Sequence, residues 1–340
     1  MDLVFDIETD DLDATKIYCI VAIDENDNQY TFDIIDDNIL KGLDFLAEAD
    51  KLIGHNIIGF DIPVIKRLHD IDLWDKKKVI DTLVLSRLFN PVREKGHALK
   101  VWGAKLGVPK GTPPEDFSVY TKDTLEYCIK DVLLNKVLFD YLKKESAGFS
   151  KESINLEHYV TYILAQQKDN GFKIDIKHTT NLLSELNCKL KKVQDEVHRT
   201  FKPRWVDIKE VTPKLKKDGT LKKLGLTDYE YEDIKSSKNM KPFMRKELVE
   251  FNLGSRKQIG EYLISFGWKP KKFTPTGQPI VDEGTLKNIT HIREAKLIAD
   301  FLLYQKRIAQ IGSWIDAVKD DERVHGSVFS TGAITGRMAH

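Results

Sequence analysis

Long hydrophobic runs are missing from this sequence of 340 residues. No apolar stretch reaches the roughly 18 residues that a membrane-spanning helix needs, and the first residues form no basic and apolar signal region. Cysteine is scarce as well, because Cys19, Cys128 and Cys188 are odd in number and widely spaced. This spacing predicts buried thiols rather than a disulfide framework or a zinc site. We therefore expect a cytoplasmic protein with no membrane association.

The sequence also lacks a net charge, since 53 basic residues balance 53 acidic ones. The balance hides two unlike halves: residues 1–150 carry an excess of about nine acidic charges, and residues 151–340 carry an equal basic excess. An acidic region can hold cations, whereas a basic region suits contact with a polyanion, although solvated charged faces would also explain the basic half. The length is sufficient for about two domains.

Strand-like and helix-like stretches alternate in the first half of the chain. This pattern predicts an α/β domain with a mixed sheet flanked by helices. Strands are expected at 3–8, 17–23, 29–34, 51–55 and 79–82, and helices at 38–49 and 62–69, with several more up to residue 144.

Long helical runs dominate the second half, at 154–169, 179–201 and 291–318. These lengths are typical of an extended helical arm. A Lys-rich and turn-rich insertion at 203–246 interrupts the pattern, and within it Lys217-Asp218-Gly219-Thr220 predicts a hairpin turn.

Acidic side chains occur in three separated segments of the first half. Asp6 and Glu8 lie on one face of the first predicted strand, because successive side chains of a strand point to opposite faces. Asp61 opens a predicted helix, and Asp131 follows Tyr127 by one helical turn. Carboxylates gathered in a partly desolvated site repel one another and need cations, and oxygen ligands favour Mg²⁺ or Mn²⁺. Two such ions can activate water and stabilise the leaving oxygen in phosphodiester cleavage, so the first hypothesis is a nuclease.

Each of these positions also has an ordinary structural explanation. Acidic residues are common at strand ends, and Asp61 could interact only with the dipole of its helix. Tyr127 and Asp131 could be unrelated side chains beside the apolar stripe of an amphipathic helix.

Taken in order, the three segments resemble the exonuclease motifs of the DEDD superfamily, in the tyrosine-containing branch attached to family A DNA polymerases. The acidic pair, the spacing from Asn56 to Phe60-Asp61, and the Tyr-x-x-x-Asp pattern carry this resemblance. Residues 80–88 and 96–103 are similar to polymerases of the T-odd bacteriophage type.

The resemblance implies a ribonuclease H-like fold with 3′–5′ proofreading exonuclease activity. It implies that two Mg²⁺ or Mn²⁺ ions are held by Asp6, Glu8, Asp61 and Asp131, and that Tyr127 orients the attacking water. Asn56 and Phe60 are expected to contact the substrate, a single-stranded 3′ end of DNA. Structural roles are expected for two other residues, a helix cap for Asp81 and a hydrogen-bonded or packed helix start for His97.

The resemblance continues through the second half and implies three regions. These are an exonuclease domain at 1–147, a mainly helical thumb-like region at 148–322 that contains the insertion, and the beginning of a palm at 323–340. Ser255, Arg256, Lys257 and Gln258 match the end of the thumb, where basic and neutral donors approach the backbone of primer-template duplex. Arg337 matches an arginine that reaches the minor groove near the primer terminus.

The polymerase carboxylates and the nucleotide-binding fingers of that family do not occur in these residues. We therefore expect an incomplete palm and a need for a complementary chain with palm and fingers before DNA synthesis, in a bacterial cytoplasm if a phage encodes the protein. The insertion is short and matches poorly, so a thioredoxin-like processivity subunit is not expected. Two other readings stay open: a self-sufficient exonuclease acting on DNA or RNA, and a nuclease-inactive DNA-binding module.

Overall fold

A computed structural model describes residues 1–76 and 78–340 as two compact units, which are described separately. Unit 1 comprises Met1–Lys173 and Lys319–His340, and unit 2 comprises Ile174–Val318. Among the described residues, no helix combines the length and apolar character required to cross a membrane.

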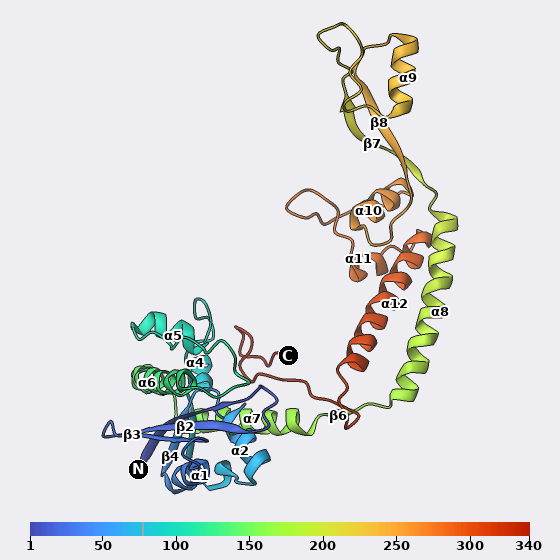
Figure 1. Ribbon diagram of the computed structural model, residues 1–340. Helices are drawn as coiled ribbons and strands as arrows, with labels where there is room; N and C mark the ends of the chain where they lie inside the picture. Colours follow the sequence, from blue (N-terminus) through green and yellow to red (C-terminus); the bar gives the residue numbers. More distant parts are fainter. Residues whose placement is uncertain (77) are drawn as a thin grey trace. The chain divides into compact units, whose positions relative to one another are not determined.

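Unit 1 is built on a five-stranded mixed sheet with the order β3-β2-β1-β4-β5 (Figure 1). The central strand β1 pairs antiparallel with β2 and parallel with β4, and the outer pairs are antiparallel β2 with β3 and parallel β4 with β5. The strands are β1 (Asp2–Thr9), β2 (Ile17–Asp24), β3 (Gln29–Asp33), β4 (Lys51–Gly54) and β5 (Lys78–Asp81). The predicted fold class, a mixed sheet flanked by helices, is confirmed.

Helices cover both faces of this sheet (Figure 1). Leu3, Phe5 and Ile7 of β1 pack in one core with apolar residues of α1 and α2, whereas Val4 faces a second core that contains Cys128 of α6. The alternation of β1 thus turns Asp6 and Glu8, which share a face with Val4, toward the α6 side. The helices of unit 1 are α1 (Ile39–Glu48), α2 (Asp61–His69), α3 (Leu73–Lys76), α4 (Thr82–Phe89), α5 (Leu99–Leu106), α6 (Lys122–Glu145) and α7 (Lys151–Asn170).

The last part of the chain returns to unit 1. The short strand β9 (Arg323–Val324) pairs antiparallel with β6 (Phe172–Lys173). Farther on, Phe329 forms an isolated bridge with Ala339, and the Arg87 guanidinium lies 4.6 Å from the Phe329 ring centroid. Strands β6 and β9 thus form a separate two-stranded sheet within unit 1.

Unit 2 is mainly helical, as expected. Its helices α8 and α12 lie side by side, and α10 and α11 pack with them around an apolar core that includes Phe201, Ile259 and Ile298 (Figure 1). The elements are α8 (Ile176–Thr200), β7 (Arg204–Val211), α9 (Asp228–Ser237), β8 (Phe243–Val249), α10 (Arg256–Ser265), α11 (Glu283–Lys287) and α12 (Arg293–Asp316).

The Lys-rich insertion forms the antiparallel hairpin of β7 and β8 together with α9. The predicted turn is confirmed: Gly219 has a φ of +80°, and Leu215 bridges to Leu221 across it. One cysteine prediction is wrong. Cys19 and Cys128 are buried, but Cys188 is exposed, because it lies on α8, whose only buried residue is Val197.

Candidate active site

Strand β1 carries the acidic pair on the face that α6 covers. Asp6 lies opposite Val21 and Glu8 opposite Cys19 of β2, and a register shift follows between Glu8 and Thr9. One side-chain ligand atom from each of Asp6, Glu8 and Cys128 lies within 4.8 Å of the others. The carboxylates therefore converge beside α6, as the two-residue spacing predicts.

Asp61 is the first residue of α2 and is only 3% exposed. Its Oδ1 accepts a hydrogen bond of 3.2 Å from the backbone N–H of Ile7, which lies between Asp6 and Glu8. This contact is possible because β4, the strand that leads into α2, runs parallel to β1. The third segment thus joins the acidic pair through the backbone of β1.

Helix α6 contributes Asp131, which is 5% exposed. Asp131 Oδ2 forms an ion pair of 2.9 Å with Lys110 Nζ, while Asp131 Oδ1 is buried and has no hydrogen-bond partner among the described residues. The same Lys110 Nζ lies 4.9 Å from the ring centroid of Tyr127. The helix starts with a capping box in which Thr121 and Thr124 bond each other's backbone N–H groups.

Burial and neighbouring acids raise the pKa of the acidic pair on β1. Burial raises the pKa of Asp6 well above its ordinary value, and the charges of Asp61, Glu8 and Asp131 raise it further. Burial and the charges of Asp131 and Asp61 raise the pKa of Glu8 to about 8. Burial raises the pKa of Asp61 to about 7, against the opposing effect of its backbone hydrogen bonds. The charges of both Asp61 and Asp131 act on Asp6 and on Glu8, so the acidic pair lies near the other two carboxylates.

This cluster fits divalent cations. Burial raises the pKa of each of the four acidic groups, and Asp131 Oδ1 is buried with no hydrogen-bond partner among the described residues. Lys110 supplies a single positive charge. Oxygen donors of this kind suit Mg²⁺ or Mn²⁺, and Asp6, Glu8, Asp61 and Asp131 are the residues that would hold them.

Two residues near the cluster were not predicted from the sequence. Lys110 lies in the loop between α5 and α6, where no periodicity marks it. Phe117 lies in the same loop, and its ring meets that of Tyr127 edge-on at 6.0 Å. Phe117 also lines a cavity of about 540 Å³ together with Glu8 and Phe60, so an aromatic side chain stands at the opening beside the acidic cluster.

Asn56 and Phe60 lie on the approach to α2. Asn56 is exposed, has a φ of +68°, and donates its backbone N–H to Asp81 Oδ1 at 2.9 Å. The predictions for two neighbouring residues are confirmed. Asp81 caps α4 by accepting from Leu83 and Val84, and His97 Nδ1 lies 2.8 Å from Ser86 Oγ.

The predicted duplex contacts are placed in both units. In unit 2, Ser255 caps α10 by accepting from the backbone N–H of Gln258, whereas Arg256 and Lys257 are exposed on its first turn. Arg337 belongs to unit 1, is exposed, and donates from Nε to Thr335 Oγ1 at 3.2 Å. Ser255 therefore caps the helix, and this role is compatible with the predicted contact to a phosphate.

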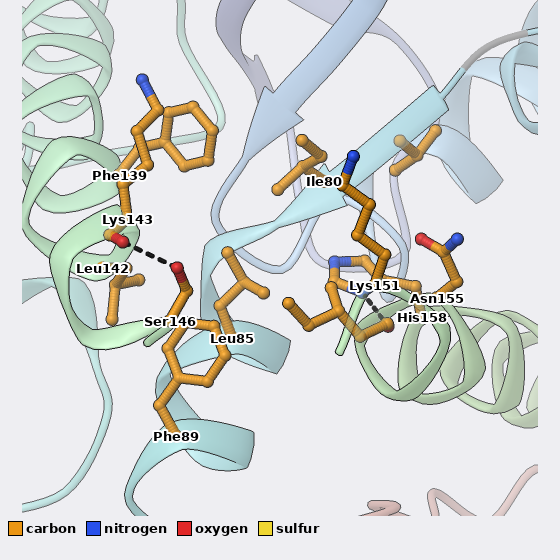
Figure 2. A pocket seen from close by; sticks show the side chains of 12 residues that line it. Ile80, Leu85, Phe89, Phe139, Leu142, Lys143, Ser146, Lys151, Asn155 and His158 are labelled. Carbon is orange, nitrogen blue, oxygen red and sulfur yellow. Dashed lines mark hydrogen bonds between the residues drawn. The ribbon is translucent and has the colours of Figure 1, made fainter. Parts of the chain in front are cut away.

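A second cavity in unit 1, of about 180 Å³, lies among β5, α4, α6 and α7 (Figure 2). Apolar side chains such as Ile80, Leu85 and Phe139 surround it, and His158 lies at its edge. As far as its lining is described, it includes none of the acidic cluster, so it is a separate feature of the fold.

Comparisons with known proteins show what the chain is similar to. No family model matches the chain. The chain is 28% identical to the DNA-directed DNA polymerase of Enterobacteria phage T3, and 27% identical to that of Escherichia phage T7. Each match covers 99% of this chain but 61% of the relative, so the chain spans about three fifths of the length of these relatives.

A solved structure shows the same fold. It is the POL domain of Pol1 from M. smegmatis in complex with DNA primer-template and dNTP, with a TM-score of 0.68 and 15% identity over 99% of this chain and 50% of that one. Fold and sequence together relate the chain to family A DNA polymerases. The predicted resemblance to an N-terminal portion of phage-type family A DNA polymerases is confirmed.

Proposed function

We propose that unit 1 is a two-metal 3′–5′ exonuclease that removes nucleotides from single-stranded 3′ ends of DNA, as the proofreading part of a phage-type DNA polymerase. The observation that carries this proposal is that four acidic side chains from three distant segments, two buried and two half-buried, lie near one another. A buried group of like charges is costly unless a reaction uses the cations that neutralise it. The similarity of the chain to phage DNA polymerases supports DNA as the substrate.

The residues have distinct tasks in this proposal. Asp6, Glu8, Asp61 and Asp131 hold two Mg²⁺ or Mn²⁺ ions. When bound, these ions supply activation of a water molecule and stabilisation of the developing charge on the leaving oxygen. Tyr127 orients the attacking water through its hydroxyl. Water bonds to the terminal phosphorus while the bond to the 3′ oxygen breaks, and this oxygen takes up a proton, so the products are a 5′-mononucleotide and a new 3′-hydroxyl end.

The surroundings suit a single strand. The cavity beside Glu8 is lined by Phe60 and Phe117, and aromatic faces bind unstacked bases with little sequence preference. Asn56 is exposed, lies four residues before Phe60 in the chain, and offers an amide to the strand. The exposed Arg256, Lys257 and Arg337 can neutralise phosphates of a primer-template duplex, with Ser255 and Gln258 as neutral donors.

The experiment is nucleotide release from a 5′-labelled single-stranded oligonucleotide in Mg²⁺ or Mn²⁺. The parent chain should shorten the strand from its 3′ end, and Asp6→Ala/Glu8→Ala should lose this activity by about 1,000-fold or more, the scale of removing a preorganised charge-stabilising group. Asp44→Ala, an exposed carboxylate on α1, is the matched control. Equal digestion by the double variant and the parent would refute the assignment.

The same assay separates the other readings. Faster trimming of RNA than DNA would favour a self-sufficient exonuclease, and duplex binding with no cleavage in Mn²⁺ would favour a DNA-binding module. A part in DNA synthesis is proposed together with palm and fingers, and it is tested by primer extension with and without a chain that supplies them. The absence of a thioredoxin-like subunit stays a prediction.

A further inference from the structure

Lys110 contacts two side chains of α6, Asp131 and Tyr127, which both have a role in the proposed exonuclease. Its ammonium is 2.9 Å from Asp131 Oδ2 and 4.9 Å from the centroid of the Tyr127 ring. The side chain therefore brings a positive charge into direct contact with the acidic cluster.

The backbone that carries Lys110 is closely packed against two helices. A Cβ at Gly103 of α5 would lie 2.7 Å from the carbonyl oxygen of Val108 and 3.2 Å from the amide nitrogen of Lys110. A Cβ at the buried Gly111 would lie 3.0 Å from Tyr127 Cδ2 and 3.2 Å from Tyr127 Cα. Only glycine allows both close approaches, so the segment around Lys110 is clamped between α5 and α6.

The ion pair with Lys110 uses only one of the two carboxylate oxygens of Asp131. Oδ2 is occupied by Lys110, and Oδ1 is buried with no partner among the residues described. An ammonium bound to one oxygen restrains the orientation of the carboxylate, and the other oxygen stays available to a cation of the cluster. The same Lys110 Nζ also restrains the Tyr127 ring through a cation–π contact.

We propose that Lys110 is a positioning residue of the exonuclease, which orients Asp131 toward a metal ion and Tyr127 toward the attacking water. The inference rests on the proposed function. A positioning role and a charge-balancing role of Lys110 predict different effects on metal binding. Because the Lys110 ammonium repels divalent ions, its removal should leave the affinity for Mn²⁺ equal or higher, while the reacting groups lose their alignment.

The test compares the parent with Lys110→Met, Lys110→Arg and the control Lys122→Met, an exposed lysine at the start of α6. Mn²⁺ binding is measured by calorimetry without DNA, and kcat and KM are measured on a single-stranded oligonucleotide. For Lys110→Met we expect kcat to fall about 100-fold, the scale of a misplaced reacting group, with Mn²⁺ binding no weaker than in the parent. Lys110→Arg should recover most of the lost kcat, and Lys122→Met should match the parent.

The outcomes separate the two claims. A parent that releases no nucleotides refutes the exonuclease and the role of Lys110 with it. An active parent with an equally active Lys110→Met variant refutes only the role of Lys110. Weaker Mn²⁺ binding in Lys110→Met alongside the lower kcat, or no recovery in Lys110→Arg, would show that the residue maintains the site as a whole and would overturn the positioning role.

Discussion

Replacing Asp61 by asparagine should stabilise the metal-free protein at alkaline pH. Asparagine has nearly the same shape as aspartate, and its Oδ1 can still accept the hydrogen bond from the backbone N–H of Ile7. The substitution removes a carboxylate that is 3% exposed and surrounded by other acids. It therefore removes the cost of ionising a buried group and keeps the packing.

The sign and size of the expected change in stability follow from proton binding by Asp61. The carboxyl of Asp61 ionises near 3.8 when exposed, and burial raises its pKa to about 7 in the folded chain. The folded chain holds this proton more tightly, so the contribution of Asp61 to stability is fully present below about pH 4, falls as pH rises toward 7, and then levels off. The whole difference corresponds to about 4 kcal/mol at most, at about 1.4 kcal/mol per pH unit. Because neighbouring acids share the cost, we expect Asp61→Asn to gain about 2 kcal/mol near pH 8 and almost nothing near pH 4.

Urea unfolding in EDTA measures this difference at both pH values, followed by a probe in unit 1. The exposed Asp44→Asn on α1 is the control and should match the parent at both. Adding Mn²⁺ should reverse the order, since ions bound by the intact cluster stabilise the parent more than the variant. If Asp61→Asn is no more stable than the parent in EDTA near pH 8, Asp61 is not an ionised member of a buried acidic cluster.

Three other substitutions test separate parts of the structure. Tyr127→Phe should lower kcat about 100-fold with Mn²⁺ binding unchanged, and equal kcat values would exclude the hydroxyl from the reaction. His158→Leu should cost about 1–3 kcal/mol of unfolding free energy in urea, because the Ile154 carbonyl and the Asp81 N–H each lose a hydrogen bond of 2.8 Å; an unchanged midpoint would contradict this. Gly103→Ala should cost about 1–3 kcal/mol by thermal unfolding, since its Cβ would meet the Val108 carbonyl oxygen at 2.7 Å; an unaltered Tm would show that the loop yields freely.

The parts of the site that follow strand and helix periodicity could be predicted from the sequence. Two-residue spacing put Asp6 and Glu8 on one face of β1, and the expected cap at Asp81 exists because its side chain follows a strand and precedes α4. The position of Asp61 after an apolar strand also fits the parallel pairing of β4 with β1. These features depend on local sequence, which is why they were accessible.

Contacts made by loops could not be predicted. Lys110 and Phe117 reach the cluster from a segment without periodicity, and only the folded packing of α5 against α6 brings them there. Cys188 was misassigned for a related reason. The helical pattern of α8 predicts a helix, but the face that is covered depends on partners that the helix itself does not encode.

The position of bound Mn²⁺ tests the central claim most directly. Anomalous diffraction from crystals of the whole chain grown with Mn²⁺ and a single-stranded oligonucleotide would locate the ions. We predict two ions, held by oxygen atoms of Asp6, Glu8, Asp61 and Asp131, with Asp131 Oδ1 among the ligands. Ions bound elsewhere, or an acidic cluster that stays free of them at saturating Mn²⁺, would contradict the account.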